Sequence, residues 1–178
     1  ERRPSTPFPL SEEAKGSAPH LNRLAGKSIL VVGGGQRVVD AQSDPVGNGR
    51  AMCRLFAREG AQVAVADMNA DAANETVSDV TSEGGKAVAI TANIADPEDI
   101  TRMVDEATQQ LGGLDGIVLN VGIGAGMHLA GSTPELWDQV LDVNLRGPML
   151  TCRAALPIMN EGGAILFVSS IASMKAGS

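Results

Sequence analysis

The chain has 178 residues, of which 43% are hydrophobic and 20% are charged, a balance typical of one folded domain rather than of a disordered segment. The 14 basic and 21 acidic residues give a formal net charge of −7, and no basic stripe interleaved with aromatic residues is present. These features argue against nucleic acid or an anionic membrane as a partner, and no apolar run is long enough to span a bilayer.

The first 22 residues are polar and rich in proline. They lack both a methionine start and the apolar core of a signal peptide, so we interpret residues 1–22 as a processed or truncated extension that packs loosely or not at all. Residues 23–178 are then expected to form a single domain. We expect a cytoplasmic protein.

The first predicted strand, residues 28–32, is a serine followed by four aliphatic residues, and it stops at Gly33, Gly34 and Gly35. A second cluster, Gly47-Asn48-Gly49, opens a predicted helix over residues 50–58. Glycines let backbone N–H groups approach a pyrophosphate at a helix N-terminus, where the peptide dipoles favour negative charge. The pattern is typical of half of a dinucleotide-binding site.

Residues 37–46 separate the two glycine clusters and have the composition of a solvated loop. An unbroken motif would run directly from the first cluster into the helix. Glycine clusters also occur in ordinary tight turns, which require positive φ angles, so this motif alone does not decide between a binding site and a turn. The remaining motifs must decide.

The second predicted strand, residues 62–66, places Asp67 at its carboxyl end, about twenty residues after the second glycine cluster. A carboxylate there accepts hydrogen bonds from the 2′- and 3′-hydroxyls of an adenosine ribose and repels a 2′-phosphate. The sequence therefore favours NAD over NADP, although Arg37 would partly offset the repulsion.

The rest of the chain alternates helices and strands. We predict helices over residues 71–83, 97–111 and 133–159, and strands over residues 86–91, 114–120 and 163–168. Asp96 is suited to cap the helix that Pro97 begins, and Gly112-Gly113 to end it. Five strands alternating with helices predict an α/β fold with a doubly wound, Rossmann-type parallel sheet.

Each predicted strand ends in residues suited to the ligand-binding edge of such a sheet. After the glycines and Asp67 come Asn93, then Asn120-Val121-Gly122, and finally Ser169-Ser170. Any one of these groups is also an ordinary turn former. Their joint order favours a binding site.

Cysteine and histidine suggest no further chemistry. Cys53 and Cys152 are far apart and outside any Cys-x-x-Cys, so we interpret them as reduced, apolar side chains. Neither His20 nor His128 has a second histidine at ligand spacing, and we predict no metal site.

The stretch from Leu24 to Ser178 resembles the short-chain dehydrogenase/reductase family. The family's glycine motif is matched, across the insertion, by both glycine clusters, and its Asn-Asn-Ala-Gly by residues 119–122. Its adenine-contacting Asp-Val pair is matched by Asn93-Ile94. Residues 137–144 are similar to the stretch that carries the family's active-site asparagine, which maps to Asn144, and Ser170 takes the place of the catalytic serine.

The resemblance implies an NAD-dependent oxidoreductase that interconverts a secondary alcohol and a ketone by hydride transfer. Ser170 would bind the substrate oxygen, and Asn144 would hold a local helix distortion and a water of the proton relay. The resemblance also implies a homo-oligomer, most commonly a tetramer. The residues expected to contact NAD are Gly33, Gly35, Gln36, Gly47, Asn48, Gly49, Asp67, Met68, Asn93, Ile94, Asn120, Val121 and Gly122.

One departure from the family is large. The chain contains no tyrosine, whereas the family's Tyr-x-x-x-Lys follows the catalytic serine, and Lys175 lies too close to Ser170 to replace its lysine. We therefore expect either the N-terminal two-thirds of an enzyme, its sheet incomplete at the C-terminal end, or a noncatalytic dinucleotide-binding or scaffold protein. The long loop before the first helix resembles the divergent enoyl-thioester reductases, but Asn144 and Ser170 fit the classical group better.

Overall fold

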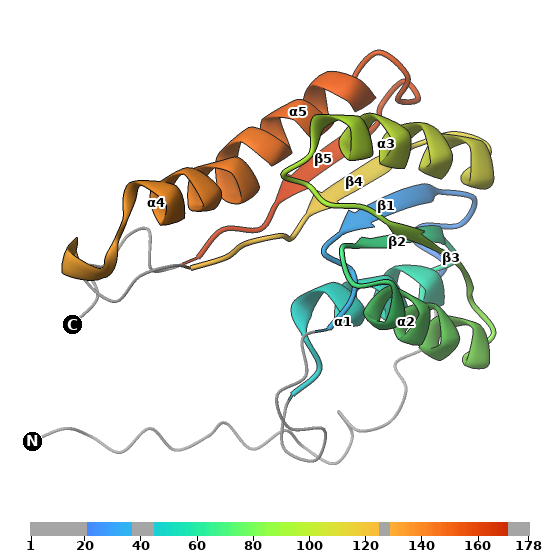
Figure 1. Ribbon diagram of the computed structural model, residues 1–178. Coiled ribbons are helices and arrows are strands. Elements are labelled where there is room, and N and C mark those ends of the chain that lie inside the picture. Colours follow the sequence, from blue (N-terminus) through green and yellow to red (C-terminus); the bar gives the residue numbers. More distant parts are fainter. Residues whose placement is uncertain (1–20, 37–44, 125–128, 171–178) are drawn as a thin grey trace, which may run out of the picture.

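The computed structural model describes residues 21–36, 45–124 and 129–170. Within them, a five-stranded parallel sheet lies between two layers of helices (Figure 1). The strand order is β3-β2-β1-β4-β5, which confirms the predicted doubly wound, Rossmann-type α/β fold. The strands are β1 (Ser28–Val32), β2 (Gln62–Asp67), β3 (Lys86–Thr91), β4 (Gly116–Leu119) and β5 (Ala164–Phe167).

Two pairs of helices cover the sheet. Helices α1 (Asn48–Arg58) and α2 (Ala70–Ser82) lie on one face, and α3 (Pro97–Leu111) and α5 (Gly147–Ala155) lie on the other (Figure 1). Helix α4 (Pro134–Leu141) extends beyond the edge of the sheet. A short 3-10 turn, η2 (Leu129–Gly131), precedes it.

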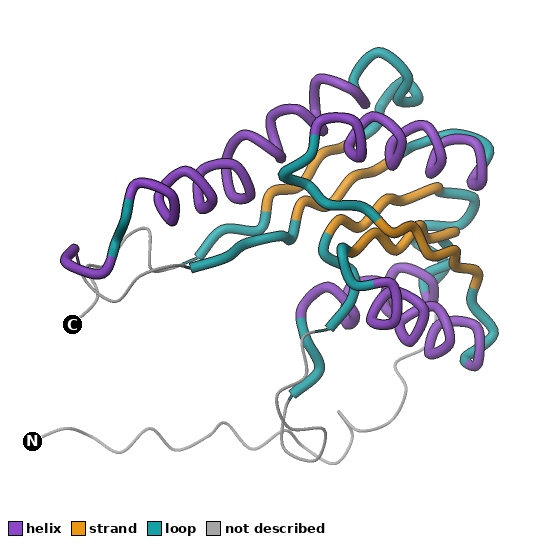
Figure 2. The backbone as a smooth tube through the Cα atoms, viewed as in Figure 1, coloured by secondary structure: helices purple, strands orange, loops and turns teal. Residues whose placement is uncertain are grey.

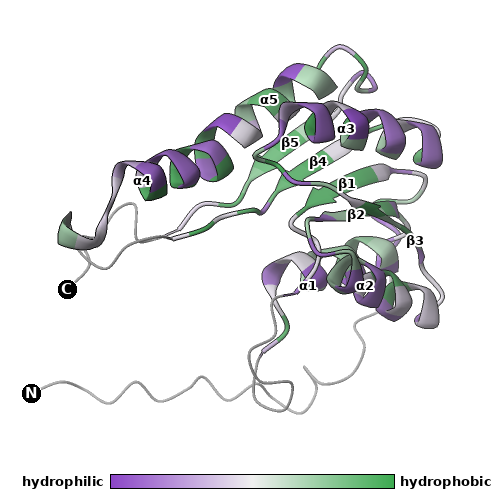
Figure 3. Cartoon of the chain, in the orientation of Figure 1, coloured by the Kyte–Doolittle hydropathy of each residue, from purple (hydrophilic) through white to green (hydrophobic). Residues whose placement is uncertain are grey.

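Burial on both faces explains the aliphatic strands. All five residues of β1 are buried; Leu30 packs into the core under α3 and α5, and Val31 into the core under α1 and α2. Successive strand residues point to opposite faces, so a strand covered on both sides needs an unbroken apolar run. The sheet is accordingly the most hydrophobic layer in Figure 3, while the outer faces of the helices are more polar.

Local capping rules fix several helix ends as predicted. The Asp96 side chain accepts a hydrogen bond from the N–H of Glu98 at 2.8 Å, and Pro97 is the first residue of α3. The helix ends at Gly112, whose φ of 74° is left-handed. Asn69 caps α2 in the same way, accepting from the N–H groups of Asp71 and Ala72.

The single helix predicted over residues 133–159 is wrong in two respects. A π-helical segment, η3 (Asp142–Arg146), separates α4 from α5, although Figure 2 shows the three as one continuous helical run. The run also stops at Ala155, because Pro157 has no N–H to donate to the carbonyl of Arg153 and so cannot continue the hydrogen-bond pattern.

The other predicted elements agree with the structure to within two residues at each end. The predicted extension, residues 1–22, and the inserted segment, residues 37–46, lie almost wholly outside the described residues. In the described part of the chain, no helix is both long and apolar enough to cross a membrane.

Candidate functional site

A cleft of about 500 Å³ lies at the carboxyl ends of β1 to β4. It forms where strand order reverses, since the chain leaving β1 passes to one face of the sheet and the chain leaving β4 to the other, which opens a crevice between them. The residues that line it are Val32, Gly33, Gly35, Gln36, Asp67, Met68, Asn69, Ala72, Ala92, Asn93, Ile94, Ala95, Asn120, Val121, Gly122, Ile123, Gln139 and Val143.

The glycine turn after β1 forms one wall. Gly33 has a φ of 79°, and its N–H and that of Gly34 donate to the carbonyl of Ala66, at 2.8 and 3.0 Å. A Cβ atom at Gly49 would lie 1.9 Å from the Gly33 carbonyl oxygen. Glycine is therefore required at Gly49, where the first turn of α1 packs directly on the glycine turn.

Gly47, Asn48 and Gly49 do not line the cleft, although they form the start of α1 as predicted. Gln36 lines it instead and is hydrogen-bonded to the backbone beside α1. Its Oε1 accepts from the N–H of Gly47 at 3.1 Å, and its Nε2 donates to the carbonyl of Pro45 at 3.3 Å. The amide of Gln36 thus joins the two glycine clusters across the insertion.

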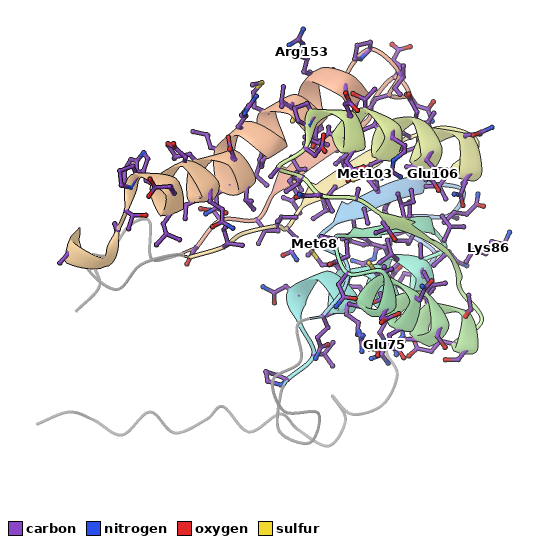
Figure 4. The ribbon with its side chains drawn as sticks, in the orientation of Figure 1. Met68, Glu75, Lys86, Met103, Glu106 and Arg153 are labelled. Carbon is purple, nitrogen blue, oxygen red and sulfur yellow. The ribbon has the colours of Figure 1, made fainter. Side chains whose placement is uncertain are left out.

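Asp67 lies at the carboxyl end of β2, where the sequence predicts a ribose-binding carboxylate. Its Oδ2 accepts from the N–H of Gly35 and its Oδ1 from the N–H of Asn69, both at 3.0 Å. Two backbone donors therefore orient the carboxylate, while each oxygen retains a lone pair for a ligand. Met68 follows with 73% of its surface exposed and also lines the cleft (Figure 4).

Asn93 and Ile94 lie in the turn between β3 and α3, at one end of the cleft. β3 ends at Thr91, so Asn93 follows the strand by two residues instead of terminating it. Ile94 is buried, whereas Asn93 is exposed.

Asn120 lies in the cleft wall after β4. Its Nδ2 donates to the carbonyl of Gly33 at 2.9 Å, so that it holds the glycine turn to the end of β4. Val121 and Gly122 continue the wall, as the sequence predicts.

Neither of the two candidate catalytic residues lines the cleft. Asn144 is in the π-helical segment η3, and its side-chain amide is hydrogen-bonded to the backbone of Ile123, which does line the cleft. Ser170 follows β5, is exposed, and stands at the same carboxyl edge of the sheet. That edge is shared because the N–H of Val168, just after β5, donates to the carbonyl of Leu119, the last residue of β4.

Sequence reasoning did not identify several lining residues, among them Asn69, Ala95, Gln139 and Val143. Asn69 carried a local signal, since it caps the helix two residues after Asp67. Gln139 and Val143 are four residues apart on one helical face, a spacing that would have indicated their shared orientation but not what they face.

Other features of the described residues give weaker indications of a functional site. A depression of about 830 Å³ lies against α3, but all its lining residues come from that one helix, so no groups converge on it from separate elements. Burial raises the pKa of the Cys53 thiol to about 12, which makes it a poor nucleophile. The described residues contain no group of three His, Cys, Asp or Glu side chains placed to hold a metal ion.

Comparison with known proteins shows extensive similarity. A family model described as enoyl-(acyl carrier protein) reductase matches residues 45–178. Versicolorin reductase stcU of Emericella nidulans is 36% identical over 155 residues, which cover 86% of this chain and 55% of that protein. A 2,5-dichloro-2,5-cyclohexadiene-1,4-diol dehydrogenase of Sphingobium indicum is 37% identical over 158 residues, covering 86% of this chain and 58% of that protein.

Solved structures of short-chain dehydrogenases also resemble this chain. A short-chain dehydrogenase from Burkholderia cenocepacia in complex with NADP superposes with a TM-score of 0.77 at 31% identity, covering 88% of this chain and 60% of that one. A short-chain dehydrogenase/reductase from Serratia marcescens gives a TM-score of 0.77 at 32% identity, covering 86% and 59%. The chain thus spans little more than half the length of the relatives it matches.

Proposed function

The chain belongs to the short-chain dehydrogenase/reductase family, and from that premise we propose that the full-length protein is an NAD-dependent oxidoreductase that interconverts a secondary alcohol and a ketone. The observation that carries the proposal is the cleft at the strand reversal, with a glycine turn in one wall and the oriented carboxylate of Asp67 beside it. Such a cleft suits a dinucleotide whose pyrophosphate lies near the start of α1.

Asp67 supports NAD as the cofactor. Its carboxylate is held by two backbone N–H groups, so it does not swing away to admit a 2′-phosphate without losing both bonds. Placing phosphate beside carboxylate costs about 1–3 kcal/mol at a partly exposed site. The NADP in the B. cenocepacia structure belongs to that protein, and the proposal for this chain depends on its own Asp67.

The chemistry divides between the cofactor and the chain. Bound nicotinamide would supply or accept the hydride. The Ser170 hydroxyl would donate a hydrogen bond to the substrate oxygen as negative charge develops on it. Asn144 would position the helix beside the reacting groups. None of the 178 residues is a tyrosine, so the proposal assigns proton transfer to a group outside them.

That missing tyrosine also favours a second candidate function: a noncatalytic dinucleotide-binding or scaffold protein that retains the cleft. The two candidates share cofactor binding and differ in hydride transfer. A measurement of chemistry after binding therefore separates them.

The deciding experiment uses the full-length protein with NADH and a panel of ketones. Ser170→Ala should slow single-turnover hydride transfer by about a hundredfold while changing the NADH dissociation constant less than about threefold. Ser169→Ala, the neighbouring exposed serine, is the matched control and should transfer hydride at the wild-type rate. NADH binding without hydride transfer in the wild-type protein would support the noncatalytic candidate instead.

The oligomeric part of the proposal is a homotetramer. Trp137, Leu141, Leu145 and Met149 recur every four residues along the helical run and are exposed, with Leu145 65% accessible. Exposed apolar residues at this spacing form one continuous stripe. A stripe of this kind is typical of a helix face that pairs with another subunit.

A further inference from the structure

The end of the cleft beyond Asp67 would receive the base of the dinucleotide, an assignment that rests on the proposed function. A dinucleotide with its pyrophosphate near the glycine turn and its ribose on Asp67 directs its base away from β1, past β2 and toward β3. The side chains there are Met68, Asn69, Asn93 and Ala95. Asn93 and Asn69 are the polar side chains among these four, and the side-chain oxygen of Asn69 caps α2.

The backbone of Asn93 is committed to the protein. Its N–H donates to Oδ2 of Asp99 at 2.9 Å, and its carbonyl accepts from the N–H of Asp96 at 3.0 Å. Asp99 is itself held by Arg102 at 2.6 Å, and Arg102 also donates to the carbonyl of Thr91 at 2.8 Å. The turn that carries Asn93 is therefore braced on both sides.

The side-chain amide of Asn93 has one defined orientation. Its Oδ1 accepts from the N–H of Ala95 at 3.0 Å, and only the oxygen of the amide can accept from that donor. Turning the amide over would leave the N–H of Ala95 without an acceptor and bring two donors together. Within the described part of the chain, Nδ2 of Asn93 makes no hydrogen bond, so its two N–H groups remain for a ligand.

The identity of this free group matters because purines differ at C6. Adenine has an amino group there, which is a donor, whereas hypoxanthine has a carbonyl oxygen, which is an acceptor. An N–H of Asn93 complements the carbonyl and opposes the amino group. A carboxylate in the same place would do the reverse.

We propose that Asn93 is a specificity-determining residue that presents N–H donors to the base, so that the protein binds a 6-oxopurine dinucleotide at least as well as NAD(H). The donor set, and not the shape of the cleft, then limits how strongly adenine is selected. A site that offers hydrogen-bonding groups of the wrong kind to a substituent loses discrimination for it.

The test compares NADH with reduced nicotinamide hypoxanthine dinucleotide by calorimetric titration of the full-length protein. Wild-type protein should bind the hypoxanthine dinucleotide at least as tightly as NADH, to within about threefold. Asn93→Asp should favour NADH by about tenfold or more, since the new carboxylate accepts from the amino group and repels the carbonyl. Comparing the two ligands on each variant cancels any general effect of the added charge.

Asn69→Asp is the matched control. It makes the same chemical change in the same cleft wall, and an aspartate oxygen can still cap α2. Its ratio of the two dissociation constants should equal that of the wild-type protein. A similar shift toward NADH in this variant would overturn the assignment to Asn93.

Two further outcomes lead to different conclusions about the inference and the proposed function. A wild-type preference for NADH of more than about threefold, or a ratio unchanged in Asn93→Asp, overturns the inference and leaves the proposed function standing. Failure of the wild-type protein to bind either dinucleotide rejects the proposed function and this inference with it.

Discussion

Asn144 is joined to the backbone of Ile123 by two hydrogen bonds, each 2.8 Å long. The Ile123 N–H donates to Oδ1 of Asn144, and Nδ2 of Asn144 donates to the Ile123 carbonyl. One side chain thereby satisfies a donor and an acceptor in the loop after β4, as a neighbouring strand would. The π-helical segment that contains Asn144 is thus fixed to the wall of the cleft.

Replacing Asn144 should affect both stability and turnover. Asn144→Ala removes both hydrogen bonds and should lower the free energy of unfolding by about 1–3 kcal/mol. Turnover should also fall in the full-length enzyme, because the helix would no longer be held beside the cleft. Gln139→Ala, an exposed position of the same helical run, should change stability by less than about 0.5 kcal/mol. Urea unfolding measures both variants, and equal effects would contradict the role given to Asn144.

Asp67 should set the choice of cofactor. The wild-type protein should bind NAD(H) more tightly than NADP(H) by about 1–3 kcal/mol. Asp67→Asn retains an oxygen for one of the two backbone donors and removes the charge, so this preference should shrink by about tenfold. Calorimetric titration of both variants with both cofactors measures this preference. Equal or tighter NADP(H) binding by the wild-type protein would show that a cation elsewhere, such as Arg37, dominates.

Two glycines at the start of α1 provide a matched pair. Gly49→Ala would bring a Cβ atom to 1.9 Å from the Gly33 carbonyl oxygen, and we expect a loss of about 3 kcal/mol of stability or more. Gly47→Ala places its Cβ 3.6 Å from Cγ of Gln36, an ordinary contact, at a φ of −65° that alanine adopts freely. Its stability should lie within about 0.5 kcal/mol of the wild type. Similar unfolding midpoints for the two variants would contradict the close packing of Gly49 on the Gly33 carbonyl.

Asp115 should make stability depend on pH. Its pKa is lowered from the ordinary value chiefly by the hydrogen bond from the Ser28 N–H, 2.9 Å long, with smaller contributions from Asn160 and Lys27. The unfolded chain therefore takes up a proton at higher pH than the folded chain does. The ionised carboxylate stabilises the fold at neutral pH, and this contribution is lost as pH falls below the unfolded pKa and through the lower folded one.

Asp115→Asn should accordingly cost about 1 kcal/mol at pH 7, and the difference from the wild type should narrow below pH of about 4. Unfolding by urea at a series of pH values gives the comparison. Asp105→Asn, an exposed position on α3, serves as the control and should have little effect. A difference for Asp115→Asn that stays constant down to pH 3 would be inconsistent with the assignment.

The apolar stripe that runs along α4, η3 and α5 should hold subunits together. Leu145→Glu introduces a charge at a position that is 65% exposed in the isolated chain, and it should dissociate the full-length tetramer. Leu55→Glu on α1, where the leucine is 49% exposed, should leave the assembly unchanged. Sedimentation velocity at micromolar concentration distinguishes these results. A monomeric wild-type protein would reject the interface.

Elements whose ends depend on neighbouring residues were predictable from the sequence. Helix α3 begins and ends as predicted because Asp96, Pro97 and Gly112 fix its termini locally. The π-helical segment was not predictable from the pattern of apolar residues, because it is stabilised through Asn144 by a loop residue 21 positions earlier. The family resemblance, and not the periodicity, implied a distortion there.

The residues of the candidate site also divide into those that could be predicted from the sequence and those that could not. Asp67 could be located because it ends a strand at a fixed distance from the glycines. The position of Gln36 in front of Gly47 could not, since it depends on how the chain returns after ten inserted residues, 37–46. The assignments of Ser170 and Asn144 to catalysis remain predictions.

The strand order also implies an order of assembly. Strands β1, β2 and β3 are linked by successive crossovers, whereas β1 and β4 meet only when Ser28 and Asp115, 87 residues apart, come together. Closing that long loop costs more chain entropy than closing either short one. We therefore expect the first three strands to assemble as an early nucleus and β4 to dock later. The cofactor cleft, which needs both β1 and β4, would then be among the last parts of the molecule to form during folding.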